Sequence, residues 1–517
     1  MEPQSSADRV PHRTIITLCT VGATLMQALD QTIANVALPY MQGSLSATYD
    51  EITWVLTSYI TAAAIMTAPV GWLAARFGRK YLFITCLVGF TATSMMCGAA
   101  QSLSQMVVFR LLQGMFGAAL VPLSQSTMMD IYPAEQRGKA MAIWGIGVMV
   151  GPILGPTLGG YLTEMYNWRF VFYINLPFGI LATLGLLFFM PRSFGNFSLK
   201  FDWVGFGVLS LGIGGLQMML DRGQNQDWFT SREIITEAVL GGLGVYLFVI
   251  HMLTAKKPFI PPMLFVDRNF AAGLSLMFTT GTILVSSSSL MAPWLQNLAN
   301  YPVESAGLIM APRGIGTMAA MMLSGRLSNK MDPRWLMAAG IVALSWSMHE
   351  MTSWTPDVAQ WRIITVIVVQ GCGLGLVFLP LQVLAFATLP SQYRTDGASL
   401  FSLFRNIGAA IGVSVTSSLL AHNTQVLHEQ IGAHINPFNR ALQTGGAVTQ
   451  HWNPATVHGA SVLDQMVNQQ AQIIAYINDY RLMVFTTLSS LALLVFMRRP
   501  RYDTKAPTPD AAHAALD

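Results

Sequence analysis

The chain has 517 residues, of which 53% are hydrophobic and only 10% are charged. An ordinary soluble protein carries roughly 25% charged residues, so a soluble fold could not cover this much apolar surface. The composition excludes a nucleic-acid-binding protein, a disordered scaffold and a typical cytosolic enzyme. It indicates a polytopic membrane protein built of helices.

Fourteen apolar stretches of about 20 residues are long enough to cross a bilayer as helices. A polar segment precedes the first stretch, which is too long for the core of a cleavable signal. In chain order the predicted spans are Thr14–Leu38, Trp54–Leu73, Tyr81–Ala100, Met106–Ile131, Ala140–Leu162, Phe170–Met190, Val204–Leu220, Ile235–Leu253, Phe270–Trp294, Ala306–Leu327, Trp335–Ser353, Ile363–Leu384, Ala398–Leu420 and Leu482–Met497.

The distribution of basic residues predicts the orientation of these spans. With the N-terminus placed inside the cell, 20 of the 29 Lys and Arg residues fall in cytoplasmic segments, as the positive-inside rule requires. Six fall in outer loops and three lie within spans. The sequence therefore predicts an all-α polytopic membrane protein with an even number of spans and both termini in the cytoplasm.

One short motif occurs twice and indicates how the spans are organised. The loops Gly71–Lys80, after span 2, and Gly325–Arg334, after span 10, both begin with Gly and end in basic residues. Two six-helix halves would repeat this loop after span 8, so two helices are inserted between the halves. The predicted parts are a cytoplasmic N-terminus (1–13), a first half (14–190), an inserted pair (204–253), a second half (270–497) with a long outer loop (421–480), and a cytoplasmic tail (498–517).

Asp30 is the one carboxylate that these limits place well inside a span. A charge at the bilayer centre costs at least about 2.5–3.5 kcal/mol, so such residues usually have a partner or a function. Arg110 of span 4 falls in the same outer half of the membrane, where it can balance that charge or move away from it. We interpret the two as a proton-coupling pair. The alternatives are a packing hydrogen bond for Asp30 and a headgroup contact for Arg110.

Span 5 carries glycine at every fourth position, with two prolines among them. Glycine in a helix costs about 1 kcal/mol relative to Ala, and an interior proline about 3, so this composition needs a compensating gain. Glycines on one face let a second helix approach closely, and proline permits a bend. We predict a packing face that also acts as a gate, formed by Gly147, Gly151, Pro152, Gly155, Pro156 and Gly159.

Further candidate residues lie in the cytoplasmic loop and along the spans. The basic residues of the loop motif either bridge helix ends or act only as positive-inside anchors. The motif comprises Gly71, Arg76, Gly78 and Arg79. Polar and aromatic residues within spans 1, 4, 5 and 13 are candidates for a substrate pathway, namely Gln27, Gln31, Asn35, Gln113, Trp144, Phe404 and Arg405. The sequence names no partner for Arg405 or Arg313, and it predicts no catalytic cluster and no metal site.

Residues 421–480, between spans 13 and 14, form a polar but nearly uncharged segment. Loops beyond about 12–15 residues are usually functional or disordered. The apolar positions from Val462 to Ile477 have the spacing of a helix that continues outward from span 14. We predict that the segment lies outside the membrane and engages a partner. The alternative is a loosely ordered cap over the bundle.

These motifs resemble, over essentially the whole chain, those of major facilitator superfamily drug:proton antiporters of the fourteen-span EmrB/QacA type. Asp30–Pro39 resembles the span-1 motif, Arg110–Gly117 the span-4 motif and Gly147–Gly160 the span-5 antiporter motif. One position departs, because the loop motif usually carries Asp where this chain has Ala75. The phrase Asn436–Asn439 is similar to the EmrB branch of Gram-negative bacteria.

The resemblance implies the major facilitator fold and a proton-coupled antiporter that exports hydrophobic or amphiphilic toxic compounds by alternating access. Its partners would be small-molecule substrates, protons and membrane lipids, with no nucleic acid. A proton gradient would replace any cofactor. The bacterial inner membrane is the implied location, and the EmrB branch adds a periplasmic adaptor protein and an outer-membrane channel. The sequence leaves open a dedicated exporter of one metabolite, such as a fatty acid or siderophore. A membrane-embedded enzyme or sensor would need a residue cluster within the spans, and none is visible.

Overall fold

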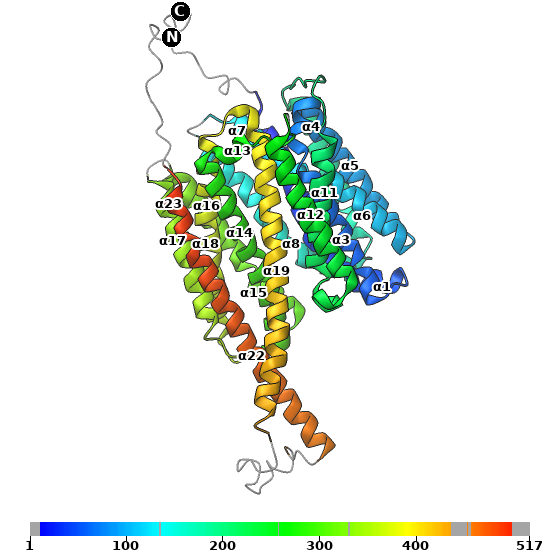
Figure 1. The fold of residues 1–517 in the computed structure, drawn as a ribbon, viewed down its shortest axis with the longest axis vertical. Coiled ribbons are helices and arrows are strands. Elements are labelled where there is room, and N and C mark those ends of the chain that lie inside the picture. The colour runs from blue at the N-terminus through cyan, green and yellow to red at the C-terminus, as the bar shows by residue number, and fades with distance from the viewer. Residues whose placement is uncertain are drawn as a thin grey trace, which may run out of the picture.

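The computed structural model describes residues 11–133, 136–256, 258–328, 331–435, 452 and 456–498, and all secondary structure in these ranges is helical. Figure 1 shows an upright bundle in which helix α1 begins, and helix α23 ends, at the same end. We call this end the termini side. The opposite end, where helices α19 and α22 project beyond the other helices, is the stem side (Figure 1).

The first group of helices forms the N-terminal bundle. Within it α1 packs along α8 and α10, α3 packs against α6, and α5 packs against α6 and α10. Pro69 interrupts the helical hydrogen bonding between α3 and α4, which are bent by 58°. The helices are α1 (Arg13–Ser44), α2 (Tyr49–Ile52), α3 (Trp54–Thr67), α4 (Val70–Phe77), α5 (Arg79–Ala99), α6 (Leu103–Gly117), α7 (Leu120–Ile131), α8 (Arg137–Met165), α9 (Phe170–Tyr173) and α10 (Asn175–Phe189).

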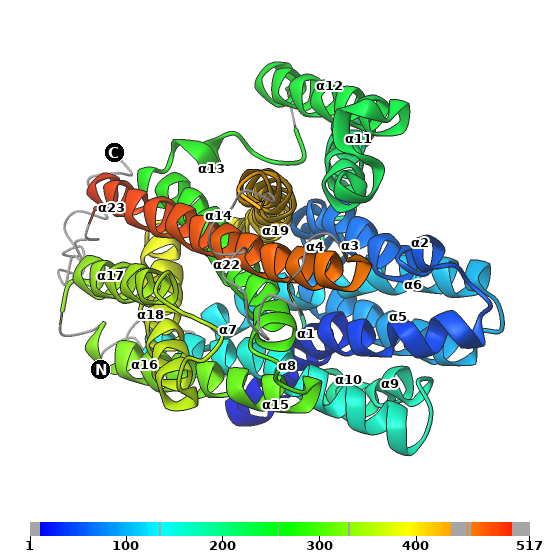
Figure 2. The same cartoon turned by 90° about the horizontal axis from the view of Figure 1, so that it is seen from below.

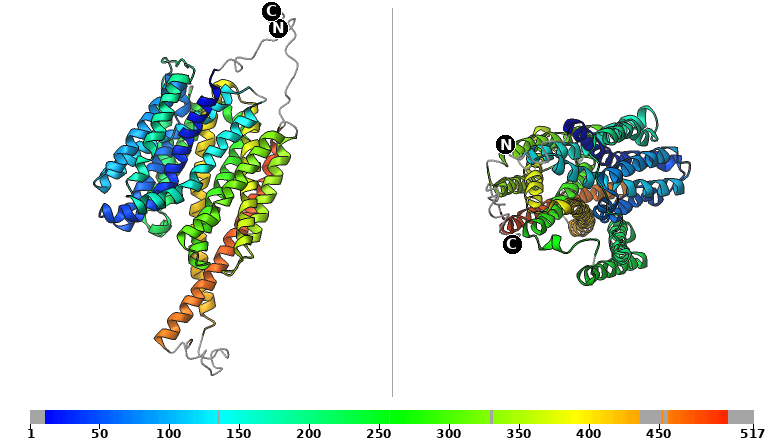
Figure 3. Two further views of the ribbon diagram at one scale, coloured as in Figure 1. Left: turned by 180° about the vertical axis from the view of Figure 1, so that it is seen from behind. Right: turned by 90° about the horizontal axis from the view of Figure 1, so that it is seen from above.

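The last group of helices forms the C-terminal bundle. Here α14 packs against α19 and α18, α16 packs against α18, and α17 packs against α18 and α22. Figure 3 shows the two bundles side by side, seen from behind and from above. The helices are α13 (Met263–Val266), α14 (Arg268–Pro293), α15 (Val303–Met310), α16 (Pro312–Leu327), α17 (Pro333–Met351), α18 (Gln360–Ala387), α19 (Arg394–Gly432), α22 (Val457–Ser489) and α23 (Leu491–Phe496).

Two helices separate these bundles in the chain, α11 (Trp203–Arg222) and α12 (Arg232–Thr254). In space they lie at the edge of the molecule (Figure 2). They pack closely on each other through glycines. A Cβ added at Gly212 would lie 2.8 Å from the backbone nitrogen of Val245. Helix α11 also contacts α3 and α19, so this pair adjoins both bundles at one flank.

The helices coincide with the predicted spans, but they do not establish the count of fourteen. Ten helical segments in the described ranges are long and apolar enough to cross a membrane, or eleven if α3 and α4 form one bent span. The other three predicted spans coincide with α1, α8 and α17, which are not among these segments. The count of fourteen and the cytoplasmic position of the termini stay predictions.

The predicted outer loop is largely helical where the structure describes it. Helix α22 runs without a break from Val457 to Ser489, which confirms the helix expected from the apolar spacing. Helix α19 likewise continues to Gly432. We call residues 421–432 of α19 and 457–472 of α22 the stem. His428 and Asp464 join its two helices at 2.9 Å between Nε2 and Oδ1. Residues 436–451 lie outside the described ranges.

An ion-pair cluster joins the two bundles on the termini side. Asp130, near the end of α7, pairs with Arg79 at the start of α5 and with Arg394 at the start of α19. The Arg394 Nη1 atom lies 2.6 Å from Asp130 Oδ1. We call these three residues the clasp. Beside them Gly71 of α4 lies so close to Asp396 that an added Cβ would come within 2.8 Å of the Asp396 Cα.

Uncharged contacts between the bundles lie next to the clasp. Gln125 of α7 donates a hydrogen bond to Gln382 of α18, and both side chains are buried. Helices α8 and α16 meet where an added Cβ at Gly325 would lie 3.2 Å from the Gly138 carbonyl oxygen. Since Gly138 lies one residue into α8, this contact is also on the termini side. The described bundles are therefore closed against each other there.

Weakening the clasp should open this end of the molecule. The Asp130→Asn substitution removes the charge shared by two arginines, and a partly exposed pair of this kind contributes up to about 1 kcal/mol. We expect a roughly 2- to 5-fold rise in the population with separated termini-side ends. Electron–electron resonance distances between spin labels at the exposed positions Lys139 and Arg326 measure this population.

The matched control is Glu350→Gln. It breaks the ion pair between Glu350 and Arg362, which lies within one bundle and joins no second bundle. A distance distribution that is the same for Asp130→Asn and the parent protein would show that the clasp does not hold the bundles together.

Candidate functional site

A row of polar residues follows one face of α1 through the interior of the N-terminal bundle. Thr17, Thr20, Thr24, Gln27 and Asp30 recur every three or four residues, and all are buried. Positions with this spacing share one side of a helix. This face of α1 therefore places polar side chains in the interior of the bundle, where the hydroxyls of Thr17, Thr20 and Thr24 donate to carbonyl oxygens of α1 itself. Asp30 carries the only charge of the row.

Asp30 forms a fully buried ion pair with Arg110 of α6. The Arg110 Nη1 atom donates to Asp30 Oδ2 at 2.7 Å, and each residue is 0% exposed. The predicted proximity of the two residues is therefore observed, while their role in proton coupling stays a prediction. Breaking such a buried pair on one side typically costs about 3–5 kcal/mol, because the remaining charge is left without compensation.

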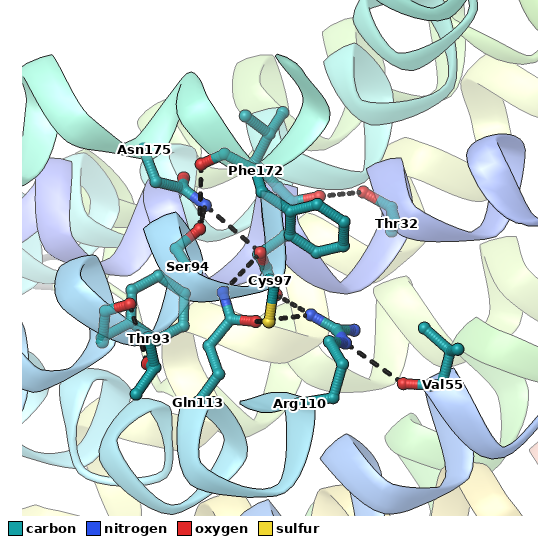
Figure 4. A network of polar contacts seen from close by, with 12 residues as sticks. Thr32, Val55, Thr93, Ser94, Cys97, Arg110, Gln113, Phe172 and Asn175 are labelled. Carbon is teal, nitrogen blue, oxygen red and sulfur yellow. Dashed lines mark hydrogen bonds and ion pairs between the residues drawn. The ribbon is translucent and has the colours of Figure 1, made fainter. Parts of the chain in front are cut away.

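Two side-chain amides complete the surroundings of the carboxylate (Figure 4). Gln113 Nε2 donates to Asp30 Oδ1 at 2.8 Å, and Asn175 Nδ2 donates to the same oxygen at 3.2 Å. Asn175 also donates to Ser94 Oγ at 3.0 Å, and Ser94 donates to the Phe172 carbonyl oxygen at 2.9 Å. Helices α6 and α10 thus donate directly to the carboxyl group carried by α1, and α5 joins the network through Asn175.

Two further hydrogen bonds and two aromatic rings hold Arg110 in place (Figure 4). Its Nε donates to the Val55 carbonyl oxygen at 3.1 Å, and its Nη1 donates to Gln113 Oε1 at 2.9 Å. The guanidinium carbon lies 4.2 Å from the centre of the Tyr59 ring and 5.6 Å from that of Phe172. Aromatic faces stabilise a desolvated cation. We call Asp30, Arg110, Gln113, Asn175 and Ser94 the buried carboxylate network.

The glycine stripe of span 5 packs directly on the helix that carries Asp30. A Cβ added at Gly151 would lie 2.8 Å from the backbone carbon of Ala28 and 2.8 Å from the nitrogen of Leu29. An added Cβ at Gly159 would lie 2.9 Å from Ile33 Cγ1. Gly147 faces Val21 and Gly155 faces Thr32 in the same way. The stripe is a packing face against α1, and its proposed role as a gate stays a prediction. The side chains of Pro152 and Pro156 lie outside the described residues.

The substrate-pathway candidates do not form one group. Gln113 belongs to the buried carboxylate network, and Gln27 is buried one turn before Asp30. Asn35 is exposed near the end of α1, while Gln31 is half-buried. Trp144 is buried and lies at the junction of the bundles.

The Trp144 side chain ties the N-terminal bundle together and also reaches its partner bundle. Its Nε1 donates to Thr24 Oγ1 at 3.2 Å and to Ser124 Oγ at 3.1 Å. Its ring stacks on Phe378 of α18, with 6.3 Å between centroids. Phe404 and Arg405 of α19, in the C-terminal bundle, are both half-buried.

The loop-motif residues have separate contacts. Arg79 belongs to the clasp, whereas Arg76 donates to the Leu199 carbonyl oxygen in the segment that follows α10. Gly78 has a φ of 86°, a left-handed value that favours glycine, and an added Cβ would meet the carbonyl oxygen of Ser193. The sequence left two interpretations for the basic residues of this loop, bridging of helix ends and simple anchoring. Arg79 bridges helix ends, because it joins the start of α5 to the end of α7.

Sequence reasoning named Gln113 but missed two neutral members of the network, Asn175 and Ser94, and the acidic member of the clasp. Asn175 and Ser94 are common polar residues, and only the folded chain brings them to Asp30. Asp130 stands at the end of a predicted span and gave no signal of its own. The arginine at position 394 similarly reads as a positive-inside anchor. Charged residues in mid-span were the only strong signal.

Comparisons with known proteins agree with this architecture. The profile of the Major Facilitator Superfamily matches residues 20–413. The chain belongs to the Major Facilitator Superfamily. It is 33% identical over 488 residues to the multidrug export protein EmrB of Haemophilus influenzae, covering 94% of this chain and 96% of that relative. It is 32% identical to EmrB of Escherichia coli, covering 94% and 95% of the two chains.

Another relative carries a different name. The chain is 34% identical to the fatty acid resistance protein FarB of Neisseria gonorrhoeae, covering 89% of this chain and 91% of that one. Among solved structures, the human organic anion transporter TETRAN superposes with a TM-score of 0.58 at 14% identity, covering 92% of this chain and 100% of that chain. At that identity the likeness shows the fold alone.

The glycine stripe offers a direct test of its packing. Gly151→Ala forces a methyl group into the α1 backbone next to Asp30, and overpacking of this kind costs roughly 1–3 kcal/mol. We therefore expect a lower unfolding temperature for the purified protein. Gly160→Ala is the control, because an added Cβ there meets nothing within 4 Å. Alanine favours the helix, so this variant should be as stable as the parent or slightly more so. Equal unfolding temperatures for the two variants would refute the tight α1–α8 contact.

Proposed function

We propose that this protein is a proton-coupled antiporter that exports hydrophobic or amphiphilic toxic compounds from the cytoplasm by alternating access. The observation that carries the proposal is the buried ion pair between Asp30 and Arg110 at the junction of four helical elements. The names of the EmrB relatives support multidrug export. We place the protein in the bacterial inner membrane, where a proton gradient supplies the energy and no cofactor is needed.

The buried carboxylate network suggests how a proton and a conformational change are coupled. In the described arrangement the negative charge of Asp30 is balanced by Arg110 and accepts hydrogen bonds from two amides. Addition of a proton to Asp30 removes the charge that holds Arg110 in place, which frees α6 to move relative to α1. Removal of the proton restores the pair. The network therefore links the protonation of one atom to the relative position of helices.

Removing the titrating group tests this proposal. Asp30→Asn should abolish transport driven by a pH gradient, because the amide cannot carry a proton in exchange. The substitution also leaves Arg110 buried without a counter-charge, at a cost of about 3–5 kcal/mol. We therefore include the double variant Asp30→Asn with Arg110→Gln, in which no buried charge remains. Uptake of a rhodamine dye into inverted proteoliposomes and release of lumenal protons are measured together.

The control is Asp357→Asn, a change at an exposed carboxylate outside the helices. This control should retain both dye uptake and proton release. Gradient-driven dye uptake at the parent rate in both Asp30 variants would disprove proton coupling at this site.

A dedicated exporter of one metabolite is the second candidate. It is favoured by the gonococcal relative named for fatty acid resistance. The two candidates differ in breadth, since a multidrug exporter should protect cells against several unrelated amphiphiles and a dedicated one against a single chemical class.

We further propose that the stem docks a periplasmic adaptor protein, which would connect the transporter to an outer-membrane channel. The support is structural and limited to the stem. Its two helices project beyond the bundle, and the outward face of α22 exposes the apolar side chain of Met466 beside polar amides. The opposite face of α22 is already packed within the protein, because Gly459, Leu463 and Val467 are buried.

A charge placed on the outward face of the stem tests docking. Met466→Glu with Gln469→Glu should lower drug resistance in cells, because two carboxylates would have to be desolvated on binding a partner. Transport in proteoliposomes, where no partner is present, should be unaffected. Equal losses in both assays would assign the stem to the transporter's own fold. Normal resistance in cells would remove the docking proposal.

A further inference from the structure

Helix α16 carries a half-buried positive charge, that of Arg313, with no acidic partner among the described residues. The Arg313 side chain extends from α16 to α14, where Nη1 donates to Ser288 Oγ at 2.5 Å. Its Nη2 donates to Ser287 Oγ at 3.0 Å and to the Leu284 carbonyl oxygen at 3.2 Å. The Nε atom is buried and has no hydrogen-bond partner. Every acceptor in these contacts is neutral, so the guanidinium keeps its net charge.

A second arginine of the same bundle, Arg405, also has no acidic partner among the described residues. Arg405 lies on α19 with its backbone against Gly281 of α14, where an added Cβ would be 3.1 Å from the Arg405 Cα. Its side chain is half-buried and makes no hydrogen bond or ion pair with any described residue. Helices α14, α16 and α18 contain no Asp or Glu. The buried carboxylate of Asp479, on α22, pairs with neither arginine.

Both arginines meet one face of α14. Positions 281, 284 and 288 are spaced by three and four residues and therefore share a side of the helix. Arg405 packs at the first position and Arg313 donates at the other two. Seven residues of α-helix span roughly 10 Å. The Arg405 backbone and the groups that accept from Arg313 are thus at most about two turns apart along one face of α14, and Phe404 adjoins Arg405 in the chain.

The charge balance of the two bundles is consequently different. In the N-terminal bundle Asp30 neutralises Arg110. In the C-terminal bundle two arginines stand within predicted spans with neutral partners or none, although each charge at the bilayer centre costs at least about 2.5–3.5 kcal/mol. A guanidinium offers planar donors that match a carboxylate. An anion bound here would supply the missing counter-charge.

We infer that Arg313 and Arg405 form a subsite for the carboxylate group of an amphiphilic substrate, whose apolar part lies against the surrounding bundle. This inference rests on the proposed export function and names the substrate class of that transporter. The subsite is in the C-terminal bundle and the proposed proton-coupling network is in the N-terminal bundle. The substrate carboxylate and the transported proton therefore bind at different sites.

Binding of dodecanoate tests the inference without any proton gradient. The full-length protein is placed in phosphatidylcholine nanodiscs, and the affinity for radiolabelled dodecanoate is compared with that for the cation tetraphenylphosphonium. Arg405→Gln and Arg313→Gln should each weaken dodecanoate binding roughly 10- to 100-fold, as expected for loss of a hydrogen bond between charged groups. Tetraphenylphosphonium should bind the variants as well as the parent. Arg405→Lys should retain part of the dodecanoate affinity, because it keeps the charge but loses the planar pair of donors.

The outcomes are separable. The Arg405 side chain makes no hydrogen bond or ion pair with a described residue, so Arg405→Gln should fold normally even if Arg313→Gln, which loses three hydrogen bonds, does not. Dodecanoate affinity unchanged in Arg405→Gln would overturn the inference. An equal loss for dodecanoate and tetraphenylphosphonium would assign the arginines to structure and also overturn it. Repeating the titration in phosphatidylglycerol nanodiscs shows whether anionic lipid competes for the site; complete displacement would make a lipid phosphate its occupant and refute a substrate role.

This experiment can fail independently of the proposed function. Proton coupling is judged by Asp30, in the other bundle, and by transport. If gradient-driven transport proves absent but dodecanoate binding depends on the two arginines, the subsite stands without antiport. If transport is confirmed but the arginines do not distinguish anion from cation, only the substrate class is wrong.

Discussion

The cost of burying one carboxylate in an apolar bundle governs the N-terminal half of this structure. Asp30 is fully enclosed, and its charge is tolerated only because Arg110, Gln113 and Asn175 surround it at 2.7 to 3.2 Å. Those donors come from α6 and α10, which must therefore lie close to α1. The glycines of α8 bring that helix against the opposite side of α1. Burial of Asp30 thus requires both hydrogen-bond donors around its carboxylate and close packing of the neighbouring helices on α1.

Much of this arrangement could be predicted, and the reason is physical. A charged residue in a long apolar stretch is rare and expensive, so Asp30 and Arg110 could be identified from the sequence. The glycine spacing of span 5 likewise predicts a close helix contact, and the structure places that contact on α1. Asn175 and Ser94 could not be selected, because neutral polar residues occur in many helices at low cost. Their role depends on contacts between residues far apart in the chain.

The ends of the helices were harder to predict than their centres. The sequence placed Asp221 and Asp479 beyond the limits of predicted spans, whereas helices α11 and α22 are continuous through these positions. A hydropathy boundary marks where apolar residues become rare, and a helix continues for as long as its backbone hydrogen bonds and packing allow. The stem shows this most clearly, since α19 and α22 extend through a segment that composition alone describes as a polar loop.

The departure at Ala75 becomes understandable from the contacts around it. The Ala75 carbonyl oxygen accepts a hydrogen bond from the backbone nitrogen of Asn196 at 2.9 Å, so the segment after α10 covers this position. The negative charge that the loop motif usually carries is absent, yet Arg79 still has an acidic partner, because Asp130 on α7 pairs with it. Since Asp130 also binds Arg394 of the other bundle, the same carboxylate serves the loop and the junction between bundles. An acidic partner for a motif arginine can therefore come from a residue far away in the chain, provided that the fold brings its charge to the loop.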